Sequence, residues 1–300
     1  MIEIQNIKKS FDGLLALNDV TANIETGSVF GLIGTNGAGK STLMRTICGI
    51  YTPDSGQILI DGDPVFENPS VKSKLFYIPD DPFFFPGGTP KDMARCYCTL
   101  YPTFDSERFF YLMELLNLDP ERKIHSFSKG MKKQLSVMLG ICAGTKYLLC
   151  DETFDGLDPV IRQAIKKLFI QEMSSHDLTP IIASHNLREL EDICDHIGLL
   201  HEGGILFTKD LESMKLGIFK LQCVLKSPDH LERIAKQFPV IKQEQKGSLL
   251  TLTLRGESDE IAVLEQELNP VFWELLPLTL EEIFISEMEV KGYDFSKIYQ

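Results

Sequence analysis

The sequence feature that most constrains the fold is a glycine-rich stretch, GTNGAGKST, at residues 34–42 of the 300-residue chain. It fits the pattern Gly-x4-Gly-Lys-Ser/Thr, in which successive backbone N–H groups form a concave cradle for phosphate groups. The apolar run at residues 28–33 predicts a buried strand before this phosphate loop, and apolar residues at helical spacing predict a helix over residues 40–50 after it. We therefore expect an anion at the helix start, where the partial positive end of the helix faces it.

Each residue type in this loop has an expected part in holding a nucleotide. The glycines reach backbone angles that other residues adopt only with strain. We expect Lys40 to reach the β- and γ-phosphates and the Ser41 hydroxyl to ligate Mg2+. The alternative is a glycine-rich turn that binds nothing, and the flanking strand and helix disfavour it. The predicted nucleotide-binding residues of the loop are Gly34, Asn36, Gly37, Ala38, Gly39, Lys40, Ser41 and Thr42.

Composition narrows the class of protein. Hydrophobic residues make up 43% and charged residues 24%, which are ordinary values for a folded chain. The net charge of −13 argues against a nucleic-acid partner, because phosphate groups require clustered Lys and Arg. No apolar run approaches the roughly 20 residues that span a bilayer, and the N-terminus does not read as a signal peptide, so we expect a cytoplasmic protein. The seven cysteines predict reduced thiols rather than a metal site.

The order of apolar runs predicts two domains, at residues 1–215 and 216–300. Up to about residue 207, strand-like and helical runs alternate, which predicts an α/β fold with a mainly parallel sheet. Clustered aromatics and helical spacing predict a helical insertion over about residues 80–135. The tail reads as strand, helix, two strands, helix and strand, with a closing helix over residues 280–288. That order predicts a small α+β domain of the ferredoxin-like kind.

A second motif, YLLCDETFDGLDP at residues 147–159, ends an apolar strand in two carboxylates. Asp151 stands where a Mg2+ ion beside the phosphate loop needs a second anchor. Glu152 can polarise a water in line with the γ-phosphate, so we assign it the part of general base. The alternative is a solvated acidic strand end, which the phosphate loop and the Gly-Leu-Asp-Pro sequence that follows disfavour.

Two further segments carry anion-binding or catalytic side chains. Residues 127–131, Phe-Ser-Lys-Gly-Met, precede an apolar helix, so Ser128 and the Gly130 backbone N–H would form a second anion-binding helix start. The alternative for Ser128 is a mere helix cap. His185 follows the apolar run IIAS at the carboxyl edge of the sheet, where α/β proteins gather ligands. A structural or surface histidine is the alternative for that position.

Together these segments resemble the ATP-binding subunit of an ABC transporter, in a match that covers roughly residues 1–207. The order of the phosphate loop, the signature segment at residues 127–131, the Asp151-Glu152 pair, Gly-Leu-Asp-Pro and His185 carries the resemblance. The resemblance implies an ATPase in which two subunits sandwich two ATP molecules head to tail. Each site would join the phosphate loop of one subunit to Ser128 and Gly130 of the other.

The resemblance also implies roles for single residues and cofactors. Phe11 would stack on adenine, His185 would contact the γ-phosphate, and Asp158 would couple the two sites. ATP and Mg2+ are the implied cofactors.

The chain departs from the family pattern in places that point to one branch of it. The family usually has a Gln that contacts Mg2+ and water where residues 77–81 read Tyr-Ile-Pro-Asp-Asp here, so we expect Asp80 to stand in as a metal ligand. The usual Leu-Ser-Gly-Gly-Gln signature is Phe-Ser-Lys-Gly-Met, and Thr153 and Phe154 replace Pro-Thr. Variants of this kind resemble the bacterial exporter branch with two short membrane subunits, which includes antibiotic-resistance and peptide-toxin exporters.

The resemblance implies two protein partners, a transmembrane permease subunit and a second ATPase subunit, in a homodimer or a closely related heterodimer. The protein would then lie at the inner face of the cell membrane and drive export, of peptides or antimicrobials for example. The residues Phe83, Phe84, Phe85 and Pro86 would form an apolar docking surface for the permease, or else pack the core of the insertion. For the tail we favour support of the dimer; regulation of the ATPase and a passive supporting part are the alternatives. A non-transport ABC protein and an ATP-binding regulatory subunit with little turnover remain the alternatives.

Overall fold

The computed structural model describes residues 1–191, 193–211, 218–227, 229–256, 258–283 and 285. The chain divides into two compact units, Met1–Thr208 and Lys209–Gln300, each of which is described here by itself. This division lies a few residues before the boundary expected from the sequence.

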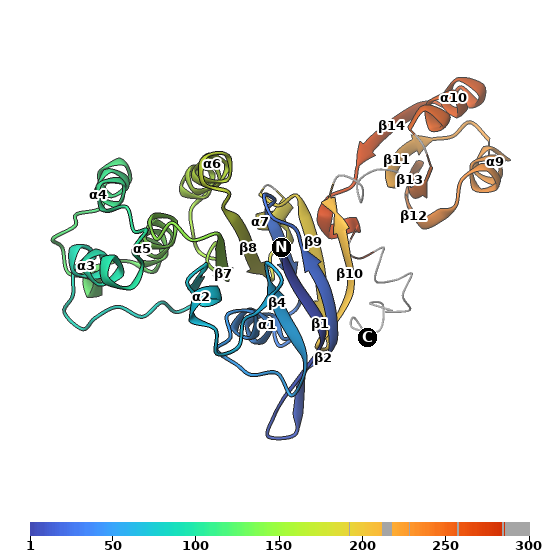
Figure 1. The fold of residues 1–300 in the computed structure, drawn as a ribbon. Coiled ribbons are helices and arrows are strands. Elements are labelled where there is room, and N and C mark those ends of the chain that lie inside the picture. The colour runs from blue at the N-terminus through green and yellow to red at the C-terminus, as the bar shows by residue number, and fades with distance from the viewer. Residues whose placement is uncertain (192, 212–217, 228, 257, 284, 286–300) are drawn as a thin grey trace. The chain divides into compact units, whose positions relative to one another are not determined.

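The first unit is built on a six-stranded sheet with the strand order β10-β9-β3-β8-β7-β6 (Figure 1). Strand β3 pairs parallel with β8 and β9, and β7 pairs parallel with β6 and β8. The strands β3, β7 and β8 are buried throughout, as their continuous apolar runs require. Because they run parallel, their carboxyl ends meet at one edge of the sheet. The strands are β3 Phe30–Ile33, β6 Leu75–Ile78, β7 Tyr147–Asp151, β8 Thr179–Ser184, β9 His196–His201 and β10 Gly204–Asp210.

A second, antiparallel sheet has the order β2-β1-β4-β5. It consists of β1 (Ile2–Phe11), β2 (Leu14–Ile24), β4 (Ser55–Ile60) and β5 (Asp63–Pro64). Its apolar side chains share one buried cluster with those of β3, β7 and the helix α1 (Lys40–Ile47). The hairpin that joins β1 and β2 pairs Phe11 with Leu14, so Phe11 lies at the tip of the first strand.

Helix α1 packs against β7 and β8 and is shorter than expected. It ends at Ile47, and Gly49 follows with a φ of 62°, a left-handed angle that favours glycine after a helix. The predicted helix over residues 40–50 is therefore too long by its last turn. The short helix α2 (Pro69–Lys72) is capped by the side chain of Asn68.

Three helices follow β6 and form the helical part of the unit, drawn in green beside that edge of the sheet in Figure 1. Helix α3 (Pro90–Leu100) begins with a capping box at Thr89, and α4 (Ser106–Leu115) begins with Asp105 as its cap. Helix α5 (Lys129–Cys142) is buried over most of its length and packs against α3, α4, α6 and β6. A 3-10 turn (Ile124–Ser126) lies between α4 and α5.

Two more helices belong to this unit. Helix α6 (Pro159–His176) begins at Asp158, whose side chain accepts hydrogen bonds from the backbone N–H groups of Val160 and Ile161, both at 3.0 Å. Helix α7 (Leu187–Glu191) follows β8 directly.

The second unit has the predicted order of strands and helices, and its sheet is antiparallel with the order β12-β13-β11-β14. Its apolar core lies between this sheet and two helices. The predicted closing helix begins at Leu280, and residues 284 and 286–288 lie outside the described residues. The elements are β11 Ile218–Val224, α9 Asp229–Gln237, β12 Val240–Lys246, β13 Leu249–Arg255, α10 Ser258–Leu268 and β14 Phe272–Pro277.

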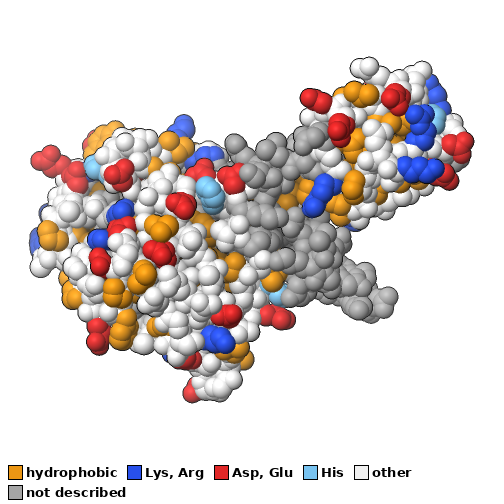
Figure 2. Space-filling view, turned by 45° about the vertical axis from the view of Figure 1, so that its right-hand side comes forward, with side chains coloured by type: hydrophobic (Ala, Val, Ile, Leu, Met, Phe, Trp, Pro, Cys, Tyr) orange, Lys and Arg blue, Asp and Glu red, His pale blue; other side chains and the backbone are white. Residues whose placement is uncertain are grey.

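Figure 2 shows one face of the molecule. Among the described residues on that face, Lys and Arg lie interspersed with Asp and Glu in both units, as on ordinary solvated surfaces. No described helix is both long and apolar enough to cross a membrane.

Candidate active site

The carboxyl ends of the parallel strands surround a cavity of about 650 Å3 in the first unit. The phosphate loop leaves β3, Glu152 follows β7, and His185 follows β8, so neighbouring strands deliver all three segments to one edge. The cavity is lined by Phe11, Leu14, Leu15, Ala16, Asn36, Gly37, Gly39, Lys40, Ser41, Thr42, Asp80, Glu152, Asp155, His185, Glu202 and Gly203.

Glycine is required at two positions of the phosphate loop. Gly39 is the N-cap of α1 with a φ of 105°, and a Cβ atom there would lie 2.5 Å from the carbonyl oxygen of Ala16. A Cβ atom on Gly34 would lie 2.5 Å from the carbonyl oxygen of Leu200. Both separations are too short for any side chain, so the loop keeps its curvature only with these residues.

Lys40 is buried beneath the loop, and its ammonium group donates hydrogen bonds to carbonyl oxygens of the loop. Its Nζ donates to the carbonyl oxygens of Gly34, at 2.7 Å, and Thr35, at 3.3 Å. The same ammonium lies 3.2 Å from Glu152 Oε1. Lys40 thus holds the loop closed on itself and places one positive charge against the candidate base.

Asp151 lies under the loop, only 1% exposed, with a hydroxyl on each of its oxygens. Ser41 Oγ donates to Oδ1 at 3.1 Å, and the Tyr77 hydroxyl donates to Oδ2 at 2.9 Å. Burial raises the pKa of Asp151 above its usual range, while the two hydrogen bonds and the charge of Arg45 oppose that rise. A cation at this carboxylate would favour its charged form.

Glu152 is held by an uncommon backbone conformation and by contacts on both of its carboxylate oxygens. Its backbone has a φ of 50°, a left-handed conformation that is uncommon for a residue other than glycine. One carboxylate oxygen faces Lys40, and the other, Oε2, lies 2.8 Å from His185 Nδ1. The structure therefore brings the phosphate-loop lysine, the candidate base and the candidate histidine together in one row.

Asp80 also lines the cavity, with its side chain 56% exposed. Its Oδ1 accepts a hydrogen bond from Lys133 Nζ at 3.2 Å. Lys133 also donates to the backbone carbonyl oxygen of Glu152. The sequence motifs do not single out this lysine, because it lies two residues beyond the signature segment, where a Lys is expected to be solvated.

Six predicted site residues do not line the cavity, and three of them, Ser128, Gly130 and Asp158, lie outside the phosphate loop and the strand end beneath it. Ser128 is exposed and caps α5, accepting a hydrogen bond from the Met131 backbone N–H at 3.2 Å. Asp158 caps α6. The structural alternative for Ser128, a helix cap, is thus present in the single chain. Gly34, Ala38 and Asp151 belong to the loop or lie beneath it and are likewise absent from the lining.

Phe11 lines the cavity from the β1–β2 hairpin and is 37% exposed. Its ring contacts Tyr51 edge to face at a centroid distance of 5.1 Å, and Lys9 Nζ lies 5.3 Å from the ring centroid. An aromatic ring that is packed against a neighbouring ring and has an exposed surface can stack on a flat ligand.

Several lining residues escaped sequence reasoning. Asp155 belongs to the acidic segment after Glu152, and Glu202 follows β9, the strand next to β3. The end of a strand that neighbours the phosphate-loop strand is a usable signal for such a position. The residues Leu14, Leu15 and Ala16 come from the hairpin strand and carry no comparable signal.

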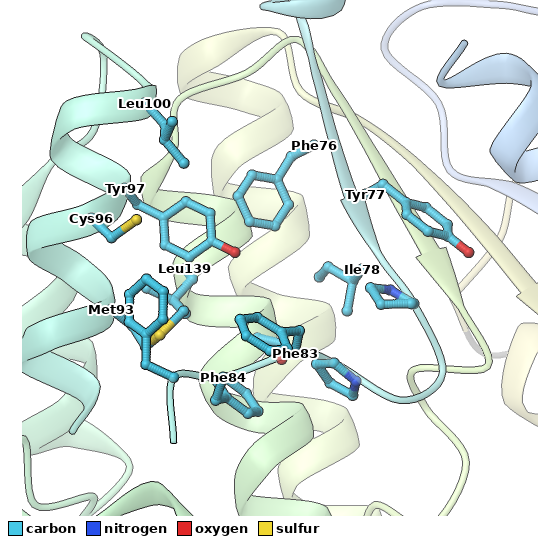
Figure 3. A pocket seen from close by; sticks show the side chains of 14 residues that line it. Phe76, Tyr77, Ile78, Phe83, Phe84, Met93, Cys96, Tyr97, Leu100 and Leu139 are labelled. Atoms are coloured by element: carbon cyan, nitrogen blue, oxygen red, sulfur yellow. The ribbon is translucent and has the colours of Figure 1, made fainter. Parts of the chain in front are cut away.

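A second cavity, of about 310 Å3, lies beside α3 and α5 and is lined mainly by apolar side chains. Phe83 and Phe85 are 71% and 41% exposed and contact each other edge to face at 6.1 Å. In Figure 3 the Tyr77 ring points away from the side chains around Tyr97, because successive strand residues face opposite sides. We call this second cavity the aromatic groove. Its lining residues are Phe76, Tyr77, Ile78, Pro79, Pro82, Phe83, Phe84, Phe85, Met93, Cys96, Tyr97, Leu100, Ser136 and Leu139.

Comparison with known proteins agrees with this geometry. Residues 17–155 match the ABC transporter family. The ABC transporter ATP-binding protein YtrB of Bacillus subtilis is 34% identical over 96% of this chain and 98% of its own length. The lantibiotic transport ATP-binding protein SrtF of Streptococcus pyogenes is 34% identical over 71% of this chain and 92% of its own length.

Solved structures share the fold of the first unit. The ATP-binding subunit of an ABC transporter superposes with a TM-score of 0.67 at 25% identity, over 72% of this chain and 92% of that one. A dimeric ATP-binding cassette solved in a post-hydrolysis state, bound to ADP and Pi, gives a TM-score of 0.64 at 18% identity, over 70% of this chain and 99% of that one. The resemblance expected from the sequence motifs is confirmed. The chain belongs to the family of ABC transporter ATP-binding proteins, whose cassettes bind ATP and couple its hydrolysis to transport.

Proposed function

We propose that this chain is the ATP-hydrolysing motor subunit of an exporter, and that it dimerises on ATP. One observation carries the proposal: Glu152 lies between Lys40 and His185 at the phosphate loop, while Ser128 lies outside the cavity of its own chain. This arrangement supports a site whose hydrolytic half would come from one chain and whose signature half would come from a second.

The nucleotide would lie along the cavity from the hairpin to the strand ends. Phe11 would stack on adenine, and the backbone N–H groups of residues 34–42 would surround the phosphates. Lys40 would exchange its bond to Glu152 for the β- and γ-phosphates, because it already lies at the loop's inner rim. The cavity volume of about 650 Å3 is in the range of small-molecule and cofactor sites.

Ser41, Asp151 and Asp80 would hold Mg2+. Their oxygens suit a hard cation, and Asp151 carries a buried carboxylate with a raised pKa that a cation would relieve. Among the described residues, no group of three or more His, Cys, Asp and Glu side chains is arranged to hold a metal, so phosphate oxygens and waters would complete the ligand set. Bound Mg2+ would neutralise charge on the β- and γ-phosphates.

Hydrolysis would begin when Glu152 accepts a proton from a water placed in line with the γ-phosphate. The water oxygen forms a bond to phosphorus as the bond to the β-γ bridging oxygen breaks, which gives ADP and inorganic phosphate. His185, 2.8 Å from Glu152, would contact the γ-phosphate and hold the base in place. Lys40 would stabilise the charge that develops on the transferred group.

A second subunit would complete each site. Ser128 and the Gly130 backbone N–H lie at the start of the 14-residue helix α5, where an anion is favoured. In a head-to-tail dimer they would contact the γ-phosphate held by the partner's loop, with Asp158 between the two sites. The second unit, with an apolar core of its own, would support the dimer.

A transmembrane permease subunit would bind this chain and respond to the closing and opening of the ATPase dimer. The aromatic groove, with Phe83 and Phe85 exposed at its rim, offers an apolar surface of the kind that a helix from a membrane subunit could bury. The chain would then act from the inner face of the cell membrane. Export of peptides or antimicrobials is supported by the lantibiotic and bacitracin transport named for relatives at 34% and 28% identity.

The test is phosphate release from the purified full chain with ATP and Mg2+. Glu152→Gln is expected to keep ATP binding, to lower turnover by at least about 100-fold, and to accumulate as an ATP-bound dimer in size-exclusion chromatography. Near-normal turnover in this variant would refute the assignment of the base. ATP binding without turnover in the unmodified chain would identify a regulatory subunit instead.

A further inference from the structure

A buried ammonium group that the proposed mechanism does not use lies beneath the active site. Lys133 is on α5, its side chain is 2% exposed, and a buried Lys is rare unless it is paired. Its two contacts reach different segments: Asp80 Oδ1 after β6 and the Glu152 carbonyl oxygen after β7. This one side chain joins the signature helix to the two acidic segments of the cavity.

The contact with Glu152 acts on a peptide that is held in an uncommon conformation. Glu152 has a φ of 50°, and its backbone N–H donates to the Ala183 carbonyl oxygen at 2.9 Å. Its carbonyl oxygen accepts from Lys133 and, at 3.4 Å, from the Asp155 backbone N–H. The direction of the carboxylate follows from this turn, because the side chain begins at the same Cα atom.

Lys133 also connects two residues that line the cavity to the helix that lines the aromatic groove. Ser136 and Leu139, farther along α5, line that groove, and Asp80 precedes the groove residues Pro82 and Phe83. A displacement of either wall of the groove would therefore reach the Glu152 turn through the Lys133 side chain, which pairs with Asp80 and donates to the Glu152 carbonyl oxygen.

We propose that Lys133 is a positioning residue that fixes the Glu152 turn and links it to the position of Asp80 and the groove. The proposal rests on the proposed function, since it requires Glu152 to be the general base. Lys133 itself does not touch the nucleotide; it sets where the base stands.

The test compares turnover in four full-length proteins: the unmodified chain, Lys133→Met, Glu152→Gln and the double variant. Methionine matches the length of the lysine stem, and Asp80 stays solvated when its partner is removed.

Lys133→Met is expected to lower kcat by at least about tenfold, since a base misplaced by about 1 Å can lower the reaction rate about a hundredfold. The Kd for a fluorescent ATP analogue is expected to change less than about threefold, because the loop contacts remain. In the Glu152→Gln background the same change is expected to lower the residual rate by less than about twofold, since the base it positions is already absent.

Lys123→Met serves as the matched control, because Lys123 is exposed and does not line the cavity. A second variant, Lys133→Gln, covers the case in which Lys133→Met does not fold; its amide is one bond shorter and cannot reach both partners, so a loss of at least about fivefold is expected.

Turnover within about twofold of the unmodified chain in a folded Lys133 variant would overturn the proposal, as would an equal loss with and without the Glu152 carboxylate. If the Glu152→Gln protein itself hydrolysed ATP at the normal rate, Glu152 would not be the general base. The proposed function would then be contradicted, and this inference with it.

Discussion

The phosphate loop and the signature segment are both helix starts that can hold an anion, but they differ in burial and in the number of hydrogen bonds that hold them. At the loop, Lys40 is buried and bonded to two carbonyl oxygens and a carboxylate. At the signature segment, Ser128 is exposed, and Lys129 forms only a surface ion pair of 3.7 Å with Asp155.

The difference shows which part of the chemistry a single chain can organise. Groups that are buried and hydrogen-bonded before ligand arrives need little rearrangement when it binds. The exposed signature start has no such network of its own beyond its cap, so its contribution would depend on a second chain. The following changes test that contrast.

The largest effect is expected from removing the buried cation. Lys40→Ala would lower turnover by more than about 100-fold and weaken ATP binding, because the phosphates lose their main positive charge and the loop loses its inner bonds. Isothermal titration with ATP and a phosphate-release assay measure both quantities. Retention of tight ATP binding would show that the backbone cradle alone suffices.

Ser128→Arg is expected to keep ATP binding in one chain and to lower turnover by about 50-fold, because a long side chain would block the start of α5 from a partner. A mixture of Lys40→Ala and Ser128→Arg chains sharpens the contrast. If sites form between chains, the mixed dimer holds one intact site and regains part of the activity. If each chain works alone, mixing two inactive chains recovers nothing.

Asp151→Asn is expected to stabilise the nucleotide-free protein at pH 7 by about 1 kcal/mol while removing Mg2+-dependent turnover. Because burial raises the pKa of Asp151, the folded protein binds that proton more tightly than the unfolded chain does. Such a group adds stability below its unfolded pKa, about 3.9, and that stability is lost as the pH rises through the raised folded pKa. Asparagine removes the buried charge, and the hydroxyls beside it can accept as well as donate.

Urea unfolding across pH 4 to 7 checks this, with Asp61→Asn as a control of opposite sign. Asp61 is partly buried, yet hydrogen bonds from Lys146 and Tyr147 hold its pKa below the usual range. Its charged form therefore stabilises the fold above the unfolded pKa, and Asp61→Asn should destabilise the protein at pH 7. A destabilised Asp151→Asn protein at pH 7 would contradict the first expectation.

Tyr77→Phe removes one of the two hydroxyl bonds to Asp151 and leaves the ring in place. We expect the Mg2+ concentration for half-maximal turnover to rise about threefold, because the second contacts of a metal ligand orient it. Tyr51→Phe, which removes a tyrosine hydroxyl that accepts a hydrogen bond from Arg45, is the matched control. An unchanged Mg2+ requirement would place the metal away from Asp151.

The smallest effect is expected at Lys129, whose ion pair is exposed on both sides. Lys129→Ala should change the free energy of unfolding by less than about 0.5 kcal/mol, since surface pairs contribute little. Thermal unfolding measures this. A larger loss would mean that the signature start is held by its own chain more firmly than its exposure indicates.

The strand, loop and helix around residues 34–42 could be predicted because several local signals agree there: an apolar run, required glycines and helical spacing. The carboxyl edge of the sheet could also be predicted, since parallel strands bring Glu152 and His185 to one side. The end of α1 at Ile47 has a local signal too, since Gly49 adopts a left-handed angle that favours glycine after a helix.

The partners of the acidic residues could not be predicted in the same way. Helix α5 is apolar on nearly all sides after its first turn, so its periodicity does not say which face is innermost, and the orientation of Lys133 depends on packing against β6 and α6. Phe76 and Tyr77 alternate along a strand with both faces covered, so the sequence does not tell which ring turns toward Asp151. Both contacts join segments that are more than ten residues apart along the chain.

Helix α5 has a mechanical consequence beyond its chemistry. Its 14 residues span about 21 Å as a stiff rod, with Ser128 at one end, Lys133 near the middle and the groove residue Leu139 toward the other. A tilt of about three degrees about one end would move the other by about 1 Å, which is the scale of misplacement that can slow a reaction about a hundredfold. Because α5 is long and stiff, a movement at the aromatic groove that is too small to break any contact there would still displace the residues at the other end of the helix, beside the nucleotide.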